Sequence, residues 1–334
     1  MLNDAINDGL HPGPNPFANL RLEQSRGRKD LIALTETELH DLADCALKVH
    51  EEYGPTFRAM ILFAGYVGRG LPDASVAGNI FASPPPIPIM SAAKQVHSGR
   101  GVLLLYGNYS GDILNFDVAA EELMADGIEV VTVRISDDVA SAPRERRQER
   151  RGVAGDIFVV KVAGAAAEEL LDLQAVAAAA EKANERTSSM GVALTSCIIP
   201  ASGKPIFQIG DDEMELGMGL HGEPGVERGR LRPASEVAEF LVSRILADLK
   251  IASGEEVAVL VNGLGATPMG ELLIIFRSVH RLLEDAGISI FRTYVGNYSA
   301  SLDMAGCSVS LMRLDSDLKR WLLAPCEGPG LVQV

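Results

Sequence analysis

The feature that most restricts the fold of this sequence is a regular alternation of apolar runs, glycine-containing loops and helical segments. The run GVLLLYG (101–107) has the length and composition of a buried strand, and the loop GNYSGD follows it directly. A helical segment over 116–127 and a second strand over 128–135 come next. Strand, loop, helix and strand in this order predict an α/β fold with a parallel sheet.

The same order recurs in the second half of the chain. There we interpret 190–200, 256–265 and 288–296 as strands and 235–254 and 269–287 as helices, after a strand over 156–164 and a helix over 173–190 that close the first half. We therefore predict two α/β domains, residues 1–186 and 187–334, each with a largely parallel mixed sheet. Since ligands collect at the carboxyl ends of parallel strands, we expect a ligand cleft there.

The first part of the chain has a different composition. Residues 1–30 are rich in Asn, Pro, Gly and Arg, which predicts an irregular arm. Apolar residues at helical spacing then predict a helix over 35–54. Thr35, with Glu38 three residues later, suits its N-terminal cap, and Gly54 suits its end.

Composition excludes several classes of function. The 334 residues hold 30 Lys and Arg against 45 Asp and Glu, a net charge of −15 that argues against nucleic-acid binding. No apolar run reaches the roughly 18 residues of a membrane span, and the first twenty residues do not have the pattern of a secretory signal. The four scattered cysteines, Cys45, Cys197, Cys307 and Cys326, predict a reduced, cytoplasmic chain without a cysteine metal site.

Three loops could carry chemistry. The first is the segment 107–112, which follows a predicted strand and ends in Asp112. Its glycines let backbone N–H groups approach a ligand, and Asp112 could accept a proton from a hydroxyl group. The alternative is that Asp112 only caps the helix that follows.

The second loop joins an acidic run, 211–215, to a glycine-rich stretch, 217–225, that contains His221. The acidic run could bind a divalent metal through oxygen, but adjacent carboxylates on a strand would point to opposite faces. His221 lies between Leu220 and Gly222, where small neighbours leave the ring open. Its imidazole could serve as a nucleophile or proton carrier, or the residue could be structural.

The third loop, 262–270, lies between a predicted strand and a predicted helix. It is similar to a phosphate-binding turn but matches neither GxGxxG nor GxxxxGK[ST], so a tight structural turn is the favoured interpretation. The basic stretch 143–152 is either a solvated surface or a site for an acidic partner or phosphate.

From about Ala64 to Asp315, the sequence resembles the substrate-binding (DhaK-type) module of dihydroxyacetone kinases. The stretches that carry the resemblance are AGYVGRGLPDASVAGNIFASP (64–84), GNYSGDILNF (107–116), RRGVAGDIFVVKVAGAAAE (150–168), MGVALTSC (190–197), GDDEMELGMGLHGEPG (210–225), VNGLGATPMGEL (261–272) and GNYSASLDMAG (296–306). The stretch over 210–225 is the most specific to this family.

The resemblance implies a two-domain α/β fold that forms homodimers. The family's covalent histidine falls on His221, which would attack the substrate ketone to form a hemiaminal, and the family's aspartate base falls on Asp112. The neighbouring residues of the two motifs would contact the substrate: Gly107, Asn108, Ser110, Gly111, Gly222 and Glu223. The phosphate donor, ATP with Mg²⁺ or a phosphoprotein, would come from a partner subunit of the DhaL type, so no cofactor or metal is expected on this chain.

Two positions depart from the family pattern. Counting back without gaps from Gly68, the family's GGGSGHEP loop falls on residues 54–61, with Ala59 in place of its histidine. The family's lysine before NYTGD is replaced by Gly107. Three functions therefore stay open. The preferred one is a kinase subunit that binds dihydroxyacetone, a tetrulose or a pentulose. The others are an isomerase of a hydroxycarbonyl sugar or sugar phosphate and a non-catalytic ketose sensor.

Overall fold

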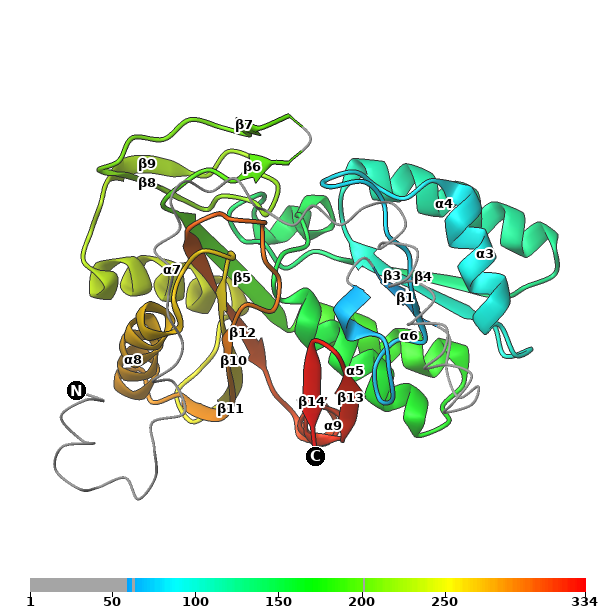
Figure 1. Cartoon of the computed structure of the whole chain (residues 1–334). Helices are drawn as coiled ribbons and strands as arrows, with labels where there is room; N and C mark the ends of the chain where they lie inside the picture. Colours follow the sequence, from blue (N-terminus) through cyan, green and yellow to red (C-terminus); the bar gives the residue numbers. More distant parts are fainter. Residues whose placement is uncertain (1–58, 62–63, 201) are drawn as a thin grey trace, which may run out of the picture. The chain divides into compact units, whose positions relative to one another are not determined.

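The computed structural model describes residues 59–61, 64–200 and 202–334 (Figure 1). The predicted arm (1–30) and the predicted helix over 35–54 lie outside these residues. Most of the positions that replace the GGGSGHEP loop lie outside them too, although Ala59 begins a short strand. Helices and sheets alternate through the described residues, which confirms the α/β class.

The first sheet is parallel throughout, with strand order β2-β1-β3-β4. Its strands are β1 (Ala59–Ile61), β2 (Ala74–Ser75), β3 (Val102–Gly107) and β4 (Val130–Ile135). Every residue of β3 is buried. Leu104 and Tyr106 pack with helices α3 (Pro86–Val96) and α4 (Ser110–Ala125), whereas Leu103 and Leu105 belong to a cluster on the opposite face. Because both faces are covered, β3 reads as a continuous apolar run.

The second sheet has strand order β11-β10-β12-β5-β8-β9. Its strands are β5 (Thr187–Ala193), β8 (Glu213–Leu216), β9 (Glu227–Arg230), β10 (Glu256–Gly263), β11 (Ser289–Gly296) and β12 (Gly306–Arg313). Only β10 and β11 pair in parallel, and the other four pairings are antiparallel. The prediction of a largely parallel sheet is therefore wrong for this half, because buried strands show the same apolar pattern in either direction.

The predicted strand over 156–164 is also wrong, since these residues belong to helix α5 (Asp156–Glu168). Twelve of its thirteen residues are buried. A helix buried on all sides lacks a polar face, so its sequence cannot be told from a buried strand by periodicity. The helix predicted over 173–190 ends earlier, because α6 (Leu173–Glu185) gives way to β5.

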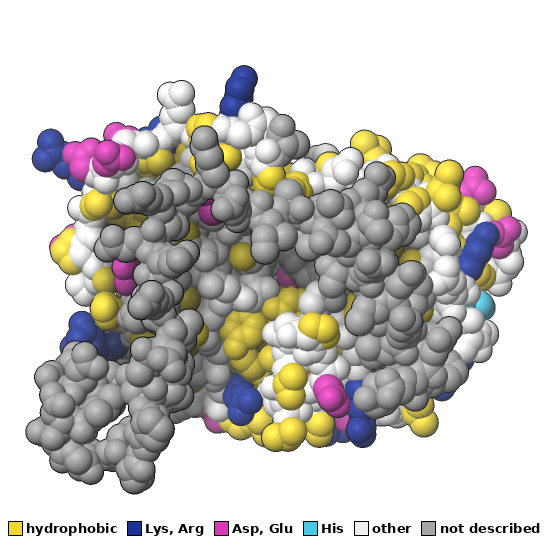
Figure 2. Space-filling view, viewed as in Figure 1, with side chains coloured by type: hydrophobic (Ala, Val, Ile, Leu, Met, Phe, Trp, Pro, Cys, Tyr) yellow, Lys and Arg dark blue, Asp and Glu magenta, His cyan; other side chains and the backbone are white. Residues whose placement is uncertain are grey.

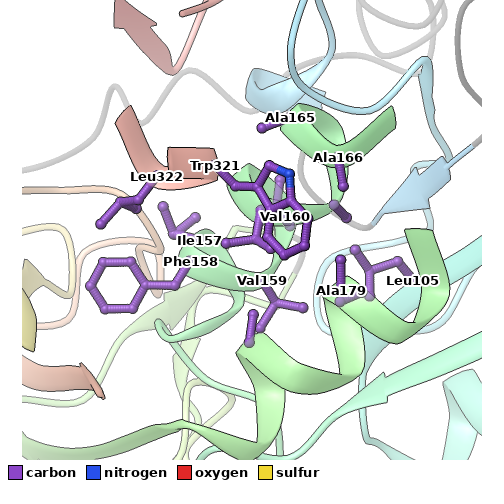
Figure 3. Close-up of a cluster of buried hydrophobic side chains, with 14 of the residues drawn as sticks. Leu105, Ile157, Phe158, Val159, Val160, Ala165, Ala166, Ala179, Trp321 and Leu322 are labelled. Carbon is purple, nitrogen blue, oxygen red and sulfur yellow. The ribbon is translucent and has the colours of Figure 1, made fainter. Parts of the chain in front are cut away.

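Helix α5 lies at the centre of the largest hydrophobic cluster (Figure 3). Phe158 and Val160 of α5 pack there with Leu105 of the first sheet and with Trp321 of helix α9 (Ser316–Leu323). Ala258 and Leu260 of β10 belong to the same cluster, whereas Val257, Val259 and Val261 face the other side of the second sheet. Helices α7 (Ala234–Leu249) and α8 (Met269–Asp285) cover that side.

The remaining elements are short. They are the 3-10 helices η1 (Ala64–Tyr66) and η2 (Arg144–Glu149), the hairpin β6 (Ile198–Ile199) and β7 (Lys204–Pro205), and the hairpin β13 (Cys326–Gly328) and β14 (Leu331–Gln333). On the face shown in Figure 2, basic side chains are scattered among acidic ones. Within the described residues, no helix is long and apolar enough to cross a membrane.

Candidate active site

His221 lies in the loop between β8 and β9, and its side chain is 33% exposed. Its ring packs against Phe81 and Tyr109, with centroid distances of 4.9 and 4.7 Å. Gly222 has φ of +83°, and a Cβ there would come within 2.4 Å of Ile206 Cδ1. This turn therefore requires glycine, which explains the small residue beside the imidazole.

Glu223 holds His221 by two contacts. Nδ1 of His221 lies 3.3 Å from Oε1 of Glu223, and the backbone N–H of His221 donates to Oε2 at 3.0 Å. Burial opposes ionisation of Glu223, but the hydrogen bond and charge of His221 prevail, with help from Arg151, and lower the pKa of this carboxyl. With Nδ1 engaged, Nε2 is the nitrogen left for chemistry.

Asp112 is in the first turn of α4, but it does not cap the helix. The N-cap residue is Tyr109, and no side chain makes a capping hydrogen bond there, so the alternative that Asp112 is only a cap is wrong. Asp112 is 5% exposed, and its Oδ1 has no partner within the described residues. Burial raises the pKa of Asp112, while a hydrogen bond from Ser83 and the charge of His221 oppose that rise. The two predicted catalytic residues are thus brought together.

The other predicted contact residues differ in their surroundings. Asn108 donates to the carbonyl oxygens of Gln148 and Arg150 at 2.9 and 2.7 Å, so its amide supports a loop. Gly107 is buried at the end of β3, whereas Ser110 and Gly111 are exposed at the start of α4.

Sequence reasoning missed Tyr109, whose ring contacts His221, and three buried aspartates, Asp137, Asp138 and Asp156. Burial raises the pKa of Asp138 to about 6, although Arg151 opposes the rise. Burial also raises the pKa values of Tyr109 and Asp156 well above their usual range. A single acid beside an otherwise apolar run, as in GVAGDIFVV, was the available signal for Asp156.

The acidic run and the third loop have structural contacts. Glu215 pairs with Arg228 and accepts a hydrogen bond from the N–H of Gly225 at 2.7 Å, which braces the loop that carries His221. In the third loop, the side chain of Asn262 accepts hydrogen bonds from the backbone N–H groups of Tyr298 and Ser299.

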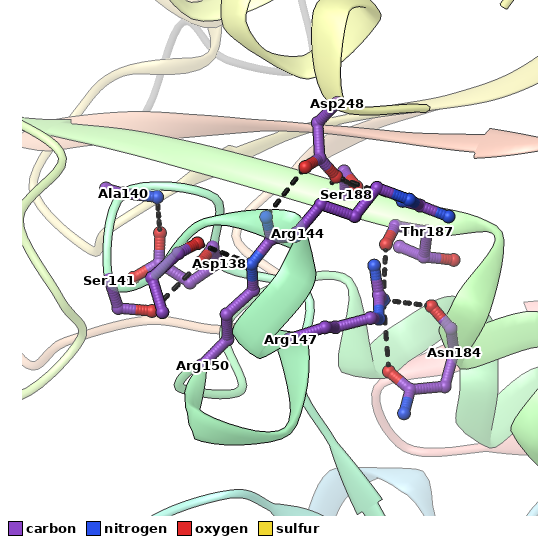
Figure 4. A network of polar contacts seen from close by, with 11 residues as sticks. Asp138, Ala140, Ser141, Arg144, Arg147, Arg150, Asn184, Thr187, Ser188 and Asp248 are labelled. Atoms are coloured by element: carbon purple, nitrogen blue, oxygen red, sulfur yellow. Dashed lines mark hydrogen bonds and ion pairs between the residues drawn. The ribbon is translucent and has the colours of Figure 1, made fainter. Parts of the chain in front are cut away.

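The basic stretch joins the two halves of the described fold (Figure 4). Arg150 is 1% exposed and pairs with Asp248 of α7 at 2.6 Å. Arg147 donates to the carbonyl oxygen of Thr187 at 2.8 Å. A wholly solvated surface is therefore the wrong interpretation, although Arg146 remains exposed.

Comparison with known proteins identifies the family, because the Dak1 domain matches residues 62–330. The chain belongs to the Dak1 family. This Dak1 chain is 50% identical over 268 residues to the dihydroxyacetone-binding subunit DhaK of the PTS-dependent dihydroxyacetone kinase 2 of Listeria innocua, which covers 80% of each chain. It is 45% identical over 267 residues to the D-erythrulose kinase of Mycolicibacterium smegmatis, covering 80% of this chain and 46% of that protein.

A solved structure has a similar fold. The Dak1 chain superposes on the dihydroxyacetone kinase operon co-activator DhaQ with a TM-score of 0.83 and 29% identity, covering 90% of this chain and 99% of the other. The Dak1 fold is therefore shared by proteins named as kinases and by a protein named as an operon co-activator.

Proposed function

We propose that this Dak1 chain is the ketose-binding subunit of a kinase. It holds a short hydroxyketone, dihydroxyacetone or a tetrulose, as a covalent adduct on His221 for phosphoryl transfer from a separate subunit. The observation that carries the proposal is the pairing of Nδ1 of His221 with Glu223, because it leaves Nε2 for the ketone on a ring that interacts electrostatically with the buried Asp112. The names of the similar proteins, a dihydroxyacetone-binding subunit and an erythrulose kinase, support this substrate class.

Glu223 explains how a neutral adduct can form. Nε2 of His221 bonds to the carbonyl carbon, and the carbon–oxygen π bond breaks. Glu223 takes the proton from Nδ1, water protonates the former carbonyl oxygen, and Glu223 returns its proton to the resulting hydroxide, so the net change moves the Nδ1 proton to that oxygen and gives a neutral hemiaminal. Only a carbonyl compound can form this adduct, so polyols without a carbonyl group are excluded.

We infer that Asp112 accepts the proton of the hydroxyl that is phosphorylated. Its Oδ1 is buried and without a partner in the described part of the chain, and its charge interacts with that of His221. A general base must reach the hydroxyl at about 2.6–3.2 Å, directly or through one water. The phosphoryl group would come from ATP with Mg²⁺ or from a phosphoprotein on a DhaL-type partner, and we expect the Dak1 chain to act as a homodimer.

The complete activity belongs to more than this chain. The Dak1 chain spans less than half the length of the D-erythrulose kinase that it resembles. A ketose sensor is the second candidate, and the likeness to the co-activator DhaQ over 99% of that chain favours it. A sensor would form the adduct without turnover.

Native mass spectrometry with dihydroxyacetone and erythrulose tests the proposal. We expect one bound ketose per chain, lost in His221→Ala and retained in His280→Ala, whose imidazole lies beside Glu284 on the surface of α8. A DhaL-type subunit with ATP, or with its phosphoprotein system, should then yield the ketose phosphate. Binding without turnover with either donor would favour the sensor, and undiminished binding in His221→Ala would contradict the adduct.

A further inference from the structure

Three residues that are linked to His221 directly or through one another each carry a buried polar atom without a hydrogen-bond partner within the described residues. These atoms are Oη of Tyr109, Oδ1 of Asp112 and Oδ1 of Asp156. Asp112 and Asp156 interact electrostatically, as do Tyr109 and Asp156. Buried polar atoms without partners are uncommon in folded proteins, so three on residues that interact with one another indicate a site that is completed by a ligand or by water.

The two other buried aspartates nearby are fully engaged. Asp137 accepts hydrogen bonds from the N–H groups of Val153 and Gly155 at 2.8 and 2.9 Å. Asp138 accepts from the N–H of Ala140 and pairs with Arg151. Asp156 is 2% exposed, yet its Oδ1 has no such donor in the described part of the fold. Asp137 and Asp138 therefore have structural partners, whereas one oxygen of Asp156 remains available for a ligand.

Gly107 lies between Asp156 and Tyr109. A Cβ at this position would lie 3.4 Å from Oδ2 of Asp156 and 3.4 Å from Cε2 of Tyr109. A Cβ on Gly152 would come within 2.6 Å of the Cα of Gly107, so the 152–156 turn packs closely on the end of β3. The carboxylate of Asp156 and the ring of Tyr109 thus both border the place that a side chain at position 107 would occupy.

We propose that Asp156 is a specificity-determining residue that hydrogen-bonds a hydroxyl group of a four-carbon hydroxyketone and favours it over dihydroxyacetone. The inference rests on the proposed function, in which His221 takes the carbonyl carbon and Asp112 the reacting hydroxyl. Dihydroxyacetone then has one hydroxyl left for two unmatched groups, Tyr109 and Asp156. A tetrulose has two hydroxyls left, and its additional carbon lies against Gly107, where a side chain is missing.

Competition between the two ketoses measures this preference directly. Equimolar dihydroxyacetone and erythrulose are mixed with the full chain, and native mass spectrometry gives the ratio of the two complexes, with each enantiomer of erythrulose tested separately. We expect the wild type to favour one enantiomer of erythrulose. Asp156→Ala should lower the erythrulose to dihydroxyacetone ratio about tenfold, the scale for a buried hydroxyl group that loses its hydrogen-bond partner. Gly107→Ala should lower it as well, by occupying the space beside Asp156.

The controls separate the possible failures. Asp156→Asn keeps the side-chain shape, so it replaces Asp156→Ala in the competition experiment if the alanine variant does not fold. Asp117→Asn, on the outer side of α4 where Asp117 pairs with Arg134, should leave the ratio unchanged. An unchanged ratio in folded Asp156 variants, or an equal loss of both ketoses, would overturn the specificity role while the proposed function stands. A wild type that binds neither ketose would overturn both.

Discussion

Nδ1 of His221 lies 3.3 Å from Oε1 of Glu223, and the other oxygen of that carboxylate accepts the backbone N–H of His221. One carboxylate therefore fixes the position of the loop and the orientation of the ring. Arg151 interacts electrostatically with Glu223 and pairs with the buried Asp138. The imidazole of His221 is thus the first group in a series of charge interactions that continues through Glu223 and Arg151 to the buried Asp138.

Glu223→Gln tests the role of that carboxylate. Glutamine keeps the shape of the side chain but cannot take the Nδ1 proton when the adduct forms, so we expect ketose affinity to fall about tenfold, as for loss of a hydrogen bond to a charged group. Isothermal titration calorimetry with dihydroxyacetone measures this change. Glu227→Gln is the control, because Glu227 lies at the start of β9 in a partly exposed pair with Arg232. Equal affinities for wild type and Glu223→Gln would contradict the proton transfer to Glu223.

Asp112→Asn should separate capture from turnover. Ketose binding should persist, whereas phosphorylation with a donor subunit should fall at least about a hundredfold, the usual contribution of a general base. In the wild type, kcat/KM should fall as the pH drops through the pKa of Asp112, which burial raises above the ordinary aspartate value. A pH–rate profile measures this acid limb. A limb at the ordinary aspartate pKa would contradict the proposed role of this buried group.

Arg150→Ala should destabilise the protein strongly. The change leaves Asp248, whose side chain is 9% exposed, without its buried partner. Breaking a buried ion pair in this way costs about 3 kcal/mol of the free energy of unfolding. Urea denaturation measures the loss. Arg146→Ala, at an exposed pair with Glu149, should change the free energy by less than about 1 kcal/mol; equal losses in both variants would contradict the importance of the buried pair.

Lys161 gives the unfolding free energy a characteristic pH dependence. The side chain is 1% exposed and donates to the carbonyl oxygen of Trp321 at 3.0 Å, and burial lowers its pKa from 10.5 to about 8. The unfolded chain therefore binds more protons between these two values, so this lysine adds stability as the pH rises from 8 to 10.5. Urea denaturation between pH 8 and 10.5 should show a rise in the free energy of unfolding of the wild type that is absent in Lys161→Met. The same pH dependence in both proteins would contradict the role of Lys161.

Local pattern predicted much of the fold. The burial of β3 and the amphipathic faces of α7 and α8 are visible in the sequence because each element packs with a regular period. Helix α5 could not be recognised, since it is apolar on every side. Strand β12 was not predicted at all, although it lies inside the second sheet, because the buried Ser308 and Ser310 interrupt its apolar pattern.

The site was predictable only in part. The loops carrying Asp112 and His221 are each marked by small residues, and the structure brings them together. Nothing local indicates that Asp156, at the start of a helix, reaches the same place, since its position depends on how the 152–156 turn packs on β3. Asn108 is the opposite case. Its loop suggests a substrate contact, but its side chain donates hydrogen bonds to the carbonyl oxygens of Gln148 and Arg150.

The central cluster around α5 has a consequence for how the molecule unfolds. Leu105 of the first sheet and Leu260 of the second are members of one continuous core, as are Trp321 and the buried face of α6. Separating the two predicted domains would expose this apolar surface on both sides, so neither sheet keeps a complete core alone. Differential scanning calorimetry of the protein should therefore show a single cooperative transition for this fold, with no intermediate in which one half stays native.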